Sequence, residues 1–142
     1  MTKKFKRTSK NIVRRVKYLQ KSKLEKEIIE GNNPIYLSDS DRITYVYKRD
    51  KEKKNILEVV NVSLEIKIKN KWLTIKRYDS SHGFLHRHTR ISINDDSEII
   101  SVAGVKKSGK HSNWLTWSIK DIKAKFWFYK RAFLKRSGIN QD

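Results

Sequence analysis

Apolar and polar residues alternate with a period of two through the middle of the chain. In residues 60–68 every second residue is apolar, which is typical of a strand with one buried face and one wet face. The apolar positions are Val60, Val62, Leu64, Ile66 and Ile68. Short polar turns separate this segment from similar ones at 43–47, 72–78, 84–93 and 98–105. The pattern predicts a mostly antiparallel β-meander of four to six strands.

Near the C-terminus the apolar period changes to three or four residues, which predicts a helix. One apolar stripe consists of Ile119, Ile122, Phe126, Tyr129 and Phe133. Ser118 and Asp121 have the spacing of a capping box, and Trp117 and Ile122 that of a hydrophobic staple. These signals predict a helix that begins near Ser118 and is stopped by Gly138. A different face of this helix carries Lys120, Lys123, Trp127 and Arg131.

The first 26 residues contain eleven basic side chains and one acid, Glu25. Ser9 is a possible N-cap and Gly31 a possible C′ residue, so we expect a basic N-terminal helix that ends near Glu30. The sequence therefore predicts an α+β fold with a basic arm and helix in residues 1–33. Residues 34–142 are expected to form a single α+β domain with an aromatic C-terminal helix.

Composition narrows the function classes. A chain of 142 residues is one domain in size, and it contains no cysteine. Disulfide scaffolds, thiolate zinc sites, iron–sulfur clusters and cysteine nucleophiles are therefore excluded. Because no run approaches 18 apolar residues and no signal peptide is evident, we expect a cytoplasmic protein without a membrane partner.

The charge balance indicates a polyanionic partner. Lys and Arg number 34 against 15 Asp and Glu, giving a net charge of +19. Lysine predominates in the N-terminal segment, which suits neutralisation of a phosphate backbone better than base readout. We expect a nucleic acid, RNA before DNA, although a solvated basic face or an acidic protein partner remains an alternative. The candidate binding residues are Lys3, Lys4, Lys6, Arg7, Lys10, Arg14, Arg15, Lys17, Arg77, Arg87, Lys120, Lys123, Trp127 and Arg131. Trp127 could stack on a base, pack against a partner protein, or cover the sheet or the N-terminal helix.

Three of the four histidines lie within seven residues and form the candidate catalytic site together with one acid. The candidates are Asp79, His82, His86 and His88. In a strand, His86 and His88 point to the same face, roughly 7 Å apart. The imidazoles could act as acid and base while Arg77 and Arg87 hold phosphate, or His82, His86 and His88 could bind a divalent metal. A third alternative is that these histidines have no chemical role. We expect no cofactor other than the divalent metal of the second alternative.

The same region resembles a known family. The segments Arg77-Tyr78-Asp79 and His82-Gly83-Phe84-Leu85-His86-Arg87-His88 are similar to the TumE-like toxin family of toxin–antitoxin systems and to related families. The resemblance extends over about residues 57–136 and leaves out the basic N-terminal segment. It implies a compact α+β protein that an antitoxin encoded beside it neutralises.

These observations lead to one main functional hypothesis and two alternatives. The main hypothesis is a toxin-like, nucleic-acid-binding protein that acts on RNA through its histidine cluster, as an endoribonuclease would. The first alternative is a non-enzymatic RNA- or DNA-binding subunit of a nucleoprotein complex. The second is an adaptor whose basic surface meets an acidic protein.

Overall fold

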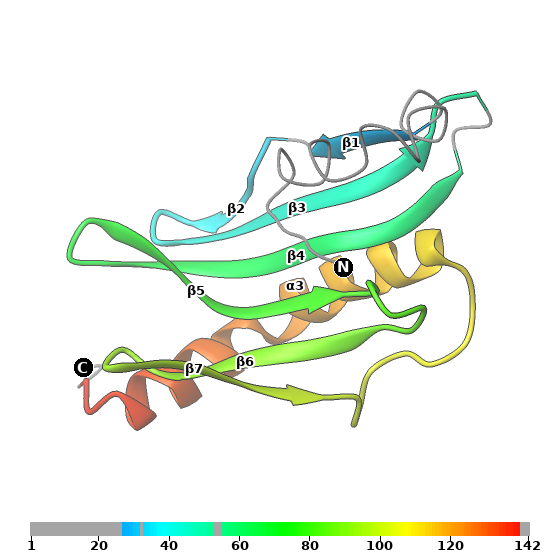
Figure 1. Cartoon of the computed structure of the whole chain (residues 1–142). Coiled ribbons are helices and arrows are strands. Elements are labelled where there is room, and N and C mark those ends of the chain that lie inside the picture. Colours follow the sequence, from blue (N-terminus) through cyan, green and yellow to red (C-terminus); the bar gives the residue numbers. More distant parts are fainter. Residues whose placement is uncertain (1–26, 32, 53–54, 140–142) are drawn as a thin grey trace, which may run out of the picture.

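The computed structural model describes residues 27–31, 33–52 and 55–139, which form a seven-stranded antiparallel sheet crossed on one face by a long helix (Figure 1). The strands are β1 (Glu27–Gly31), β2 (Ile35–Ser38), β3 (Asp41–Asp50), β4 (Ile56–Ile68), β5 (Lys71–Asp79), β6 (His86–Ser92) and β7 (Asp95–Ser101). The helix is α3 (His111–Arg136). The strand order is β1-β3-β4-β5-β6-β7, and β2 also pairs with β3. No helical segment in the described ranges has the length and apolar character needed to cross a membrane.

The α+β class and the antiparallel meander are confirmed, but the sheet has seven strands rather than four to six. The predicted N-terminal helix is wrong over Glu27–Gly31, which forms β1. The open edge of β3 supplies this segment with backbone partners, and Arg49 Nε lies 2.6 Å from Glu30 Oε1 across the pair. The rest of that predicted helix lies outside the described residues. Because β1 belongs to the sheet, the sheet begins before the expected domain boundary at residue 34.

The core lies between α3 and one face of the sheet. Its largest fully buried apolar side chains include Tyr78, Phe133, Ile43, Leu64, Ile66 and Ile122. Because side chains alternate along each strand, residues between these positions point to the other face. The sheet therefore has one face filled by α3 and one face that is free to carry polar side chains.

The helix begins earlier than the sequence predicted. It starts at His111, so the capping box at Ser118 and the staple at Trp117 are wrong. Ser118 lies inside the helix, is buried, and its hydroxyl donates to the carbonyl oxygen of Trp114 at 2.8 Å. The helix extends back because Trp114 and Leu115, one turn before Ser118, are also core residues. The predicted stop at Gly138 is confirmed.

Gly138 ends α3 in a Schellman motif, and we expect its replacement by alanine to be destabilising. The amide of Gly138 donates to Lys135 and the amide of Ile139 to Leu134, with Gly138 at φ +72°. No atom lies within 4 Å of an added Cβ, so the cost arises from the left-handed backbone alone. Gly138→Ala should lower the free energy of unfolding by about 1–2 kcal/mol in urea titration. Gly138→Asn should cost less, and equal stability of Gly138→Ala and wild type would contradict this account.

Candidate functional site

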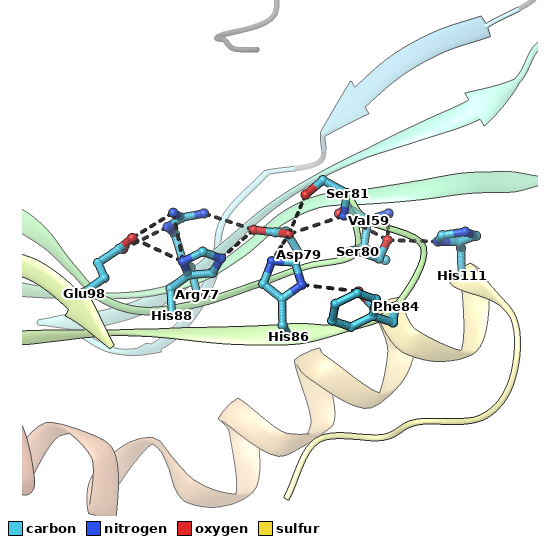
Figure 2. A network of polar contacts seen from close by, with 10 residues as sticks. All are labelled: Val59, Arg77, Asp79, Ser80, Ser81, Phe84, His86, His88, Glu98 and His111. Atoms are coloured by element: carbon cyan, nitrogen blue, oxygen red, sulfur yellow. Dashed lines mark hydrogen bonds and ion pairs between the residues drawn. The ribbon is translucent and has the colours of Figure 1, made fainter. Parts of the chain in front are cut away.

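The paired ends of β5 and β6 place four polar side chains on the sheet face away from α3 (Figure 2). In the register, Asp79 is opposite His86 and Arg77 is opposite His88. The prediction that His86 and His88 share one strand face is confirmed. Asp79, His86 and His88 are 6%, 5% and 7% exposed, so this group is buried although it lies outside the main core. We call Asp79, His86 and His88 the imidazole–carboxylate cluster.

The carboxylate of Asp79 lies between the two imidazoles. Its Oδ1 is 2.7 Å from His86 Nε2, and its Oδ2 is 2.8 Å from His88 Nε2. Ser81 donates to Oδ1 through its amide and its hydroxyl, and Arg77 Nη1 donates to Oδ2 at 3.2 Å. Burial alone would raise the pKa of Asp79, but the hydrogen bond of His86 and the charges of both imidazoles outweigh it and hold the pKa well below its ordinary value. Asp79 is therefore an ionised carboxylate in a site that holds positive charge.

Glu98 of β7 closes one side of the cluster, and no motif in the sequence points to it. Its Oε1 lies 3.2 Å from His88 Nδ1 and 2.9 Å from Arg77 Nη2, and its Oε2 accepts from Arg77 Nε at 3.0 Å. Burial raises the pKa of Glu98, but the hydrogen bond and charge of Arg77 lower it by more. The acid lies on another strand, so only the β6–β7 register reveals that it reaches His88.

The hydrogen-bond partners of His86 show which of its ring nitrogens carry protons. Its Nδ1 lies 3.3 Å from the carbonyl oxygen of Phe84, and a carbonyl can only accept, so Nδ1 bears a proton. Its Nε2 faces an ionised oxygen of Asp79, which also only accepts. Two acceptor atoms would repel each other at 2.7 Å, so Nε2 also bears a proton and donates it to Asp79 Oδ1. The Asp79 hydrogen bond raises the pKa of His86, although burial opposes it. His86 therefore holds positive charge against Asp79.

The two pKa shifts predict how the stability of the protein depends on pH. The pKa of Asp79 is lowered from 3.8, so its contribution is present above about pH 4 and is lost as the pH falls. The pKa of His86 is raised from 6.5, so its contribution is complete below about pH 6.5 and is lost as the pH rises through the folded value. We expect the contribution of this pair to be greatest between these limits. In melting temperatures measured across pH, His86→Gln should remove the alkaline decrease due to this residue, and an unchanged alkaline slope would contradict the assignment.

The other predicted site residues are not part of the cluster. His82 is exposed, and its ring stacks near that of His86, with a centroid separation of 5.6 Å. Arg87 points to the α3 side, because its neighbours in β6 occupy the opposite face. Its Nε donates to the Tyr78 hydroxyl and its Nη1 to the carbonyl oxygen of Ala103. Arg77 and Arg87 therefore cannot hold one phosphate together, and Arg77 alone adjoins the cluster.

A second candidate surface is the outer face of α3. The predicted binding residues on this helix are all exposed: Lys120, Lys123, Trp127 and Arg131. Trp127 is 55% exposed, so it does not serve mainly to cover the sheet. Phe128, which is 70% exposed, adjoins it and was missed because it falls outside both the apolar stripe and the basic face. Eight predicted binding residues lie outside the described residues: Lys3, Lys4, Lys6, Arg7, Lys10, Arg14, Arg15 and Lys17.

A serine–histidine contact at the end of β5 does not form a nucleophilic site. Ser80 Oγ lies 2.9 Å from His111 Nδ1 and accepts from the amide of Val59 at 2.8 Å. Ser80 is only 1% exposed, so a substrate cannot reach its hydroxyl. The pair instead ties β4, the end of β5 and the start of α3 together (Figure 2).

Comparison with known proteins gives a match at the level of a protein family. A family model described as a domain of unknown function (DUF7718) matches residues 25–139, which include the whole sheet and α3. No curated protein and no solved structure matches the chain.

Proposed function

This chain belongs to the DUF7718 family, a domain of unknown function, and from its own residues we propose that it is a nucleic-acid-binding protein that acts on RNA. It would act as the toxin of a toxin–antitoxin system does, with a neighbouring antitoxin as its protein partner. The observation that carries the proposal is the convergence of Asp79, His86 and His88 beside the Arg77 guanidinium. Buried, charge-shifted side chains brought together from two strands are characteristic of functional sites.

The cluster has groups suited to phosphodiester chemistry. Cleavage of RNA needs proton transfer at two oxygens and stabilisation of negative charge on the phosphate. Exposed His82, which stacks against His86, is the imidazole that a substrate reaches first. Arg77 lies within 3.2 Å of both Asp79 and His88 and supplies a fixed positive charge. In this proposal His82 transfers protons, and the buried cluster with Arg77 supplies the electrostatic field.

The outer face of α3 supplies a binding surface for single-stranded RNA. Lysine and arginine side chains around an exposed indole combine phosphate neutralisation with base stacking. Lys130 Nζ lies 5.3 Å from the Trp127 ring centroid, and the indole is still more than half exposed. A groove of about 360 Å³ adjoins it. The groove is lined by Ser38, Ser40, Asp41, Phe126, Trp127 and Lys130.

A second candidate function is that of a non-enzymatic RNA-binding subunit. The observation that favours it is the burial of His86 and His88, whose ring nitrogens all face protein atoms rather than a substrate. In that case the cluster would stabilise the ends of β5 and β6, and binding through α3 would be the whole activity.

The test is incubation of the purified full-length chain with labelled single-stranded RNA, with and without EDTA, scored for retention and cleavage on one gel. Retention with cleavage, together with growth arrest on expression, supports the toxin proposal. Retention without cleavage supports the non-enzymatic subunit. No retention at physiological salt would exclude both and favour a protein adaptor with an acidic partner.

Trp127→Ala is expected to weaken RNA retention by about tenfold or more, because stacking contributes about 1–3 kcal/mol per base. The fold should be retained, since the indole is largely solvent-exposed. Binding is measured by titration at fixed salt. Tyr36→Ser is the matched control, because Tyr36 is an exposed aromatic, 60% exposed, on β2 rather than on α3. Equal losses in the two variants would contradict a specific role for Trp127.

A further inference from the structure

A buried nitrogen of the cluster has no hydrogen-bond partner. His88 Nε2 lies 2.8 Å from Asp79 Oδ2, yet the contact does not meet hydrogen-bond geometry, and the atom has no other partner. The residue is more than nine-tenths buried. Buried ring nitrogens are normally hydrogen-bonded or bound to a metal, so this atom needs an explanation. Among the residues that the structure describes, it is one of two such buried side-chain atoms; the other is Asp41 Oδ1, which faces the Lys130 ammonium at 2.9 Å.

The second imidazole also directs its Nε2 at Asp79. His86 Nδ1 donates to the carbonyl oxygen of Phe84, so the proton on Nε2, which faces Asp79, is the one that a metal ion would displace. Two imidazole nitrogens and a carboxylate oxygen thus lie around one point, all within 4.8 Å of one another. A single cation at this point would satisfy all three atoms together.

We propose that Asp79, His86 and His88 form a binding site for a divalent first-row transition metal, with Zn²⁺ as the reference ion. Imidazole favours such metals, whereas Mg²⁺ and Ca²⁺ favour sites built from oxygen alone. Ligand atoms of a tetrahedral zinc ion with bonds of about 2.1 Å lie about 3.4 Å apart. The Asp79–histidine distances of 2.7 and 2.8 Å are shorter than this, so the carboxylate moves outward slightly when the metal enters.

The residues that contact the proposed metal ligands from outside the site are suited to a metal-binding role. Metal-binding histidines usually donate their other ring N–H to a carbonyl or carboxylate. His86 Nδ1 has the Phe84 carbonyl. His88 Nδ1 has Glu98 Oε1 and the donor Arg77 Nη2, each at 3.2 Å, so metal binding through Nε2 requires the Nδ1 proton to face Glu98. Arg77 places positive charge nearby, but two of its nitrogens contact Glu98, which offsets that charge. Three protein ligands leave a fourth position for water or substrate, as in catalytic zinc sites.

The test is calorimetric titration of the full-length, tag-free chain with ZnCl₂, and with CoCl₂ followed by visible absorbance. We expect one ion per chain, the visible bands of tetrahedral cobalt, and no comparable binding of Mg²⁺. Asp79→Asn, His86→Gln and His88→Gln should each abolish the cobalt bands. Glu98→Gln should weaken binding by about 10- to 100-fold, because it removes only the outer partner of His88.

His111→Asn is the matched control, because it removes the fourth histidine of the sequence, which contacts Ser80 rather than the cluster. It should bind metal as the wild type does. Circular dichroism and melting curves in EDTA establish that each variant is folded. The proposal is overturned if the folded wild type binds no transition metal, if Mg²⁺ binds equally well, or if binding survives in the three ligand variants. It does not depend on RNA activity: metal binding without RNA cleavage would support this site while contradicting the toxin proposal.

Discussion

Replacing Asp121 by alanine is expected to lower the free energy of unfolding by about 3 kcal/mol or more. Asp121 projects from α3 into the core, where its Oδ2 accepts from the hydroxyls of Tyr78 and Tyr129. Burial raises the pKa of Tyr78, and it raises that of Tyr129 to about 12, so both hydroxyls carry protons and donate at neutral pH. Alanine would remove their shared acceptor. Chemical denaturation monitored by tryptophan fluorescence gives the change.

Two variants separate the shared acceptor from a general effect of removing an acid. Tyr129→Phe deletes one of the two hydrogen bonds and should cost about 1 kcal/mol. Asp95→Ala removes an exposed acid whose carboxylate accepts hydrogen bonds from Ser97, and should change stability by less than about 0.5 kcal/mol. If Asp121→Ala cost no more than Asp95→Ala, the carboxylate would not be the polar link between α3 and the sheet.

The sequence predicts the sheet because the signal is local. Alternation in 60–68 depends only on which face of one strand is buried, and the structure places Val62, Leu64 and Ile66 in the core. The same period of two places His86 and His88 on one face without any knowledge of partner strands. Whether the two imidazoles meet Asp79 depends on register, which the sequence does not reveal. The cluster was therefore predicted as a set of residues but not as a geometry.

The missed features all depend on contacts distant in sequence. The segment Glu27–Gly31 has no strong strand pattern, and it becomes β1 because β3 offers it an edge and an ion pair for Glu30. Glu98 reaches His88 only through the β6–β7 pairing. The start of α3 was misplaced because Ser118 resembles a cap in sequence, whereas Trp114 and Leu115, one turn earlier, pack in the core and extend the helix back to His111. In each case tertiary contacts outweigh a local signal.

Asp79→Asn is expected to lower the rate of RNA cleavage by about 100-fold or more, within the usual range for removing a group that supplies electrostatic stabilisation. The amide keeps the shape of the side chain but removes the charge that faces His86 and His88. It also replaces the charged acceptor of Arg77 Nη1 by a neutral amide oxygen, so Glu98 is left as the carboxylate that holds Arg77. RNA retention should change little, because the binding residues of α3 lie on the other side of the sheet. Single-turnover cleavage and retention are measured on the same preparation.

Comparison with Trp127→Ala separates RNA binding from RNA cleavage, because each variant should lose only one of the two activities. Trp127→Ala should lose retention while its single-turnover rate at saturating RNA stays near that of wild type. Asp79→Asn should keep retention and lose the rate. His111→Asn, which alters a histidine outside the cluster, should behave as wild type in both measurements. Wild-type cleavage by Asp79→Asn would place the chemistry elsewhere and leave the buried cluster a structural or metal-binding role.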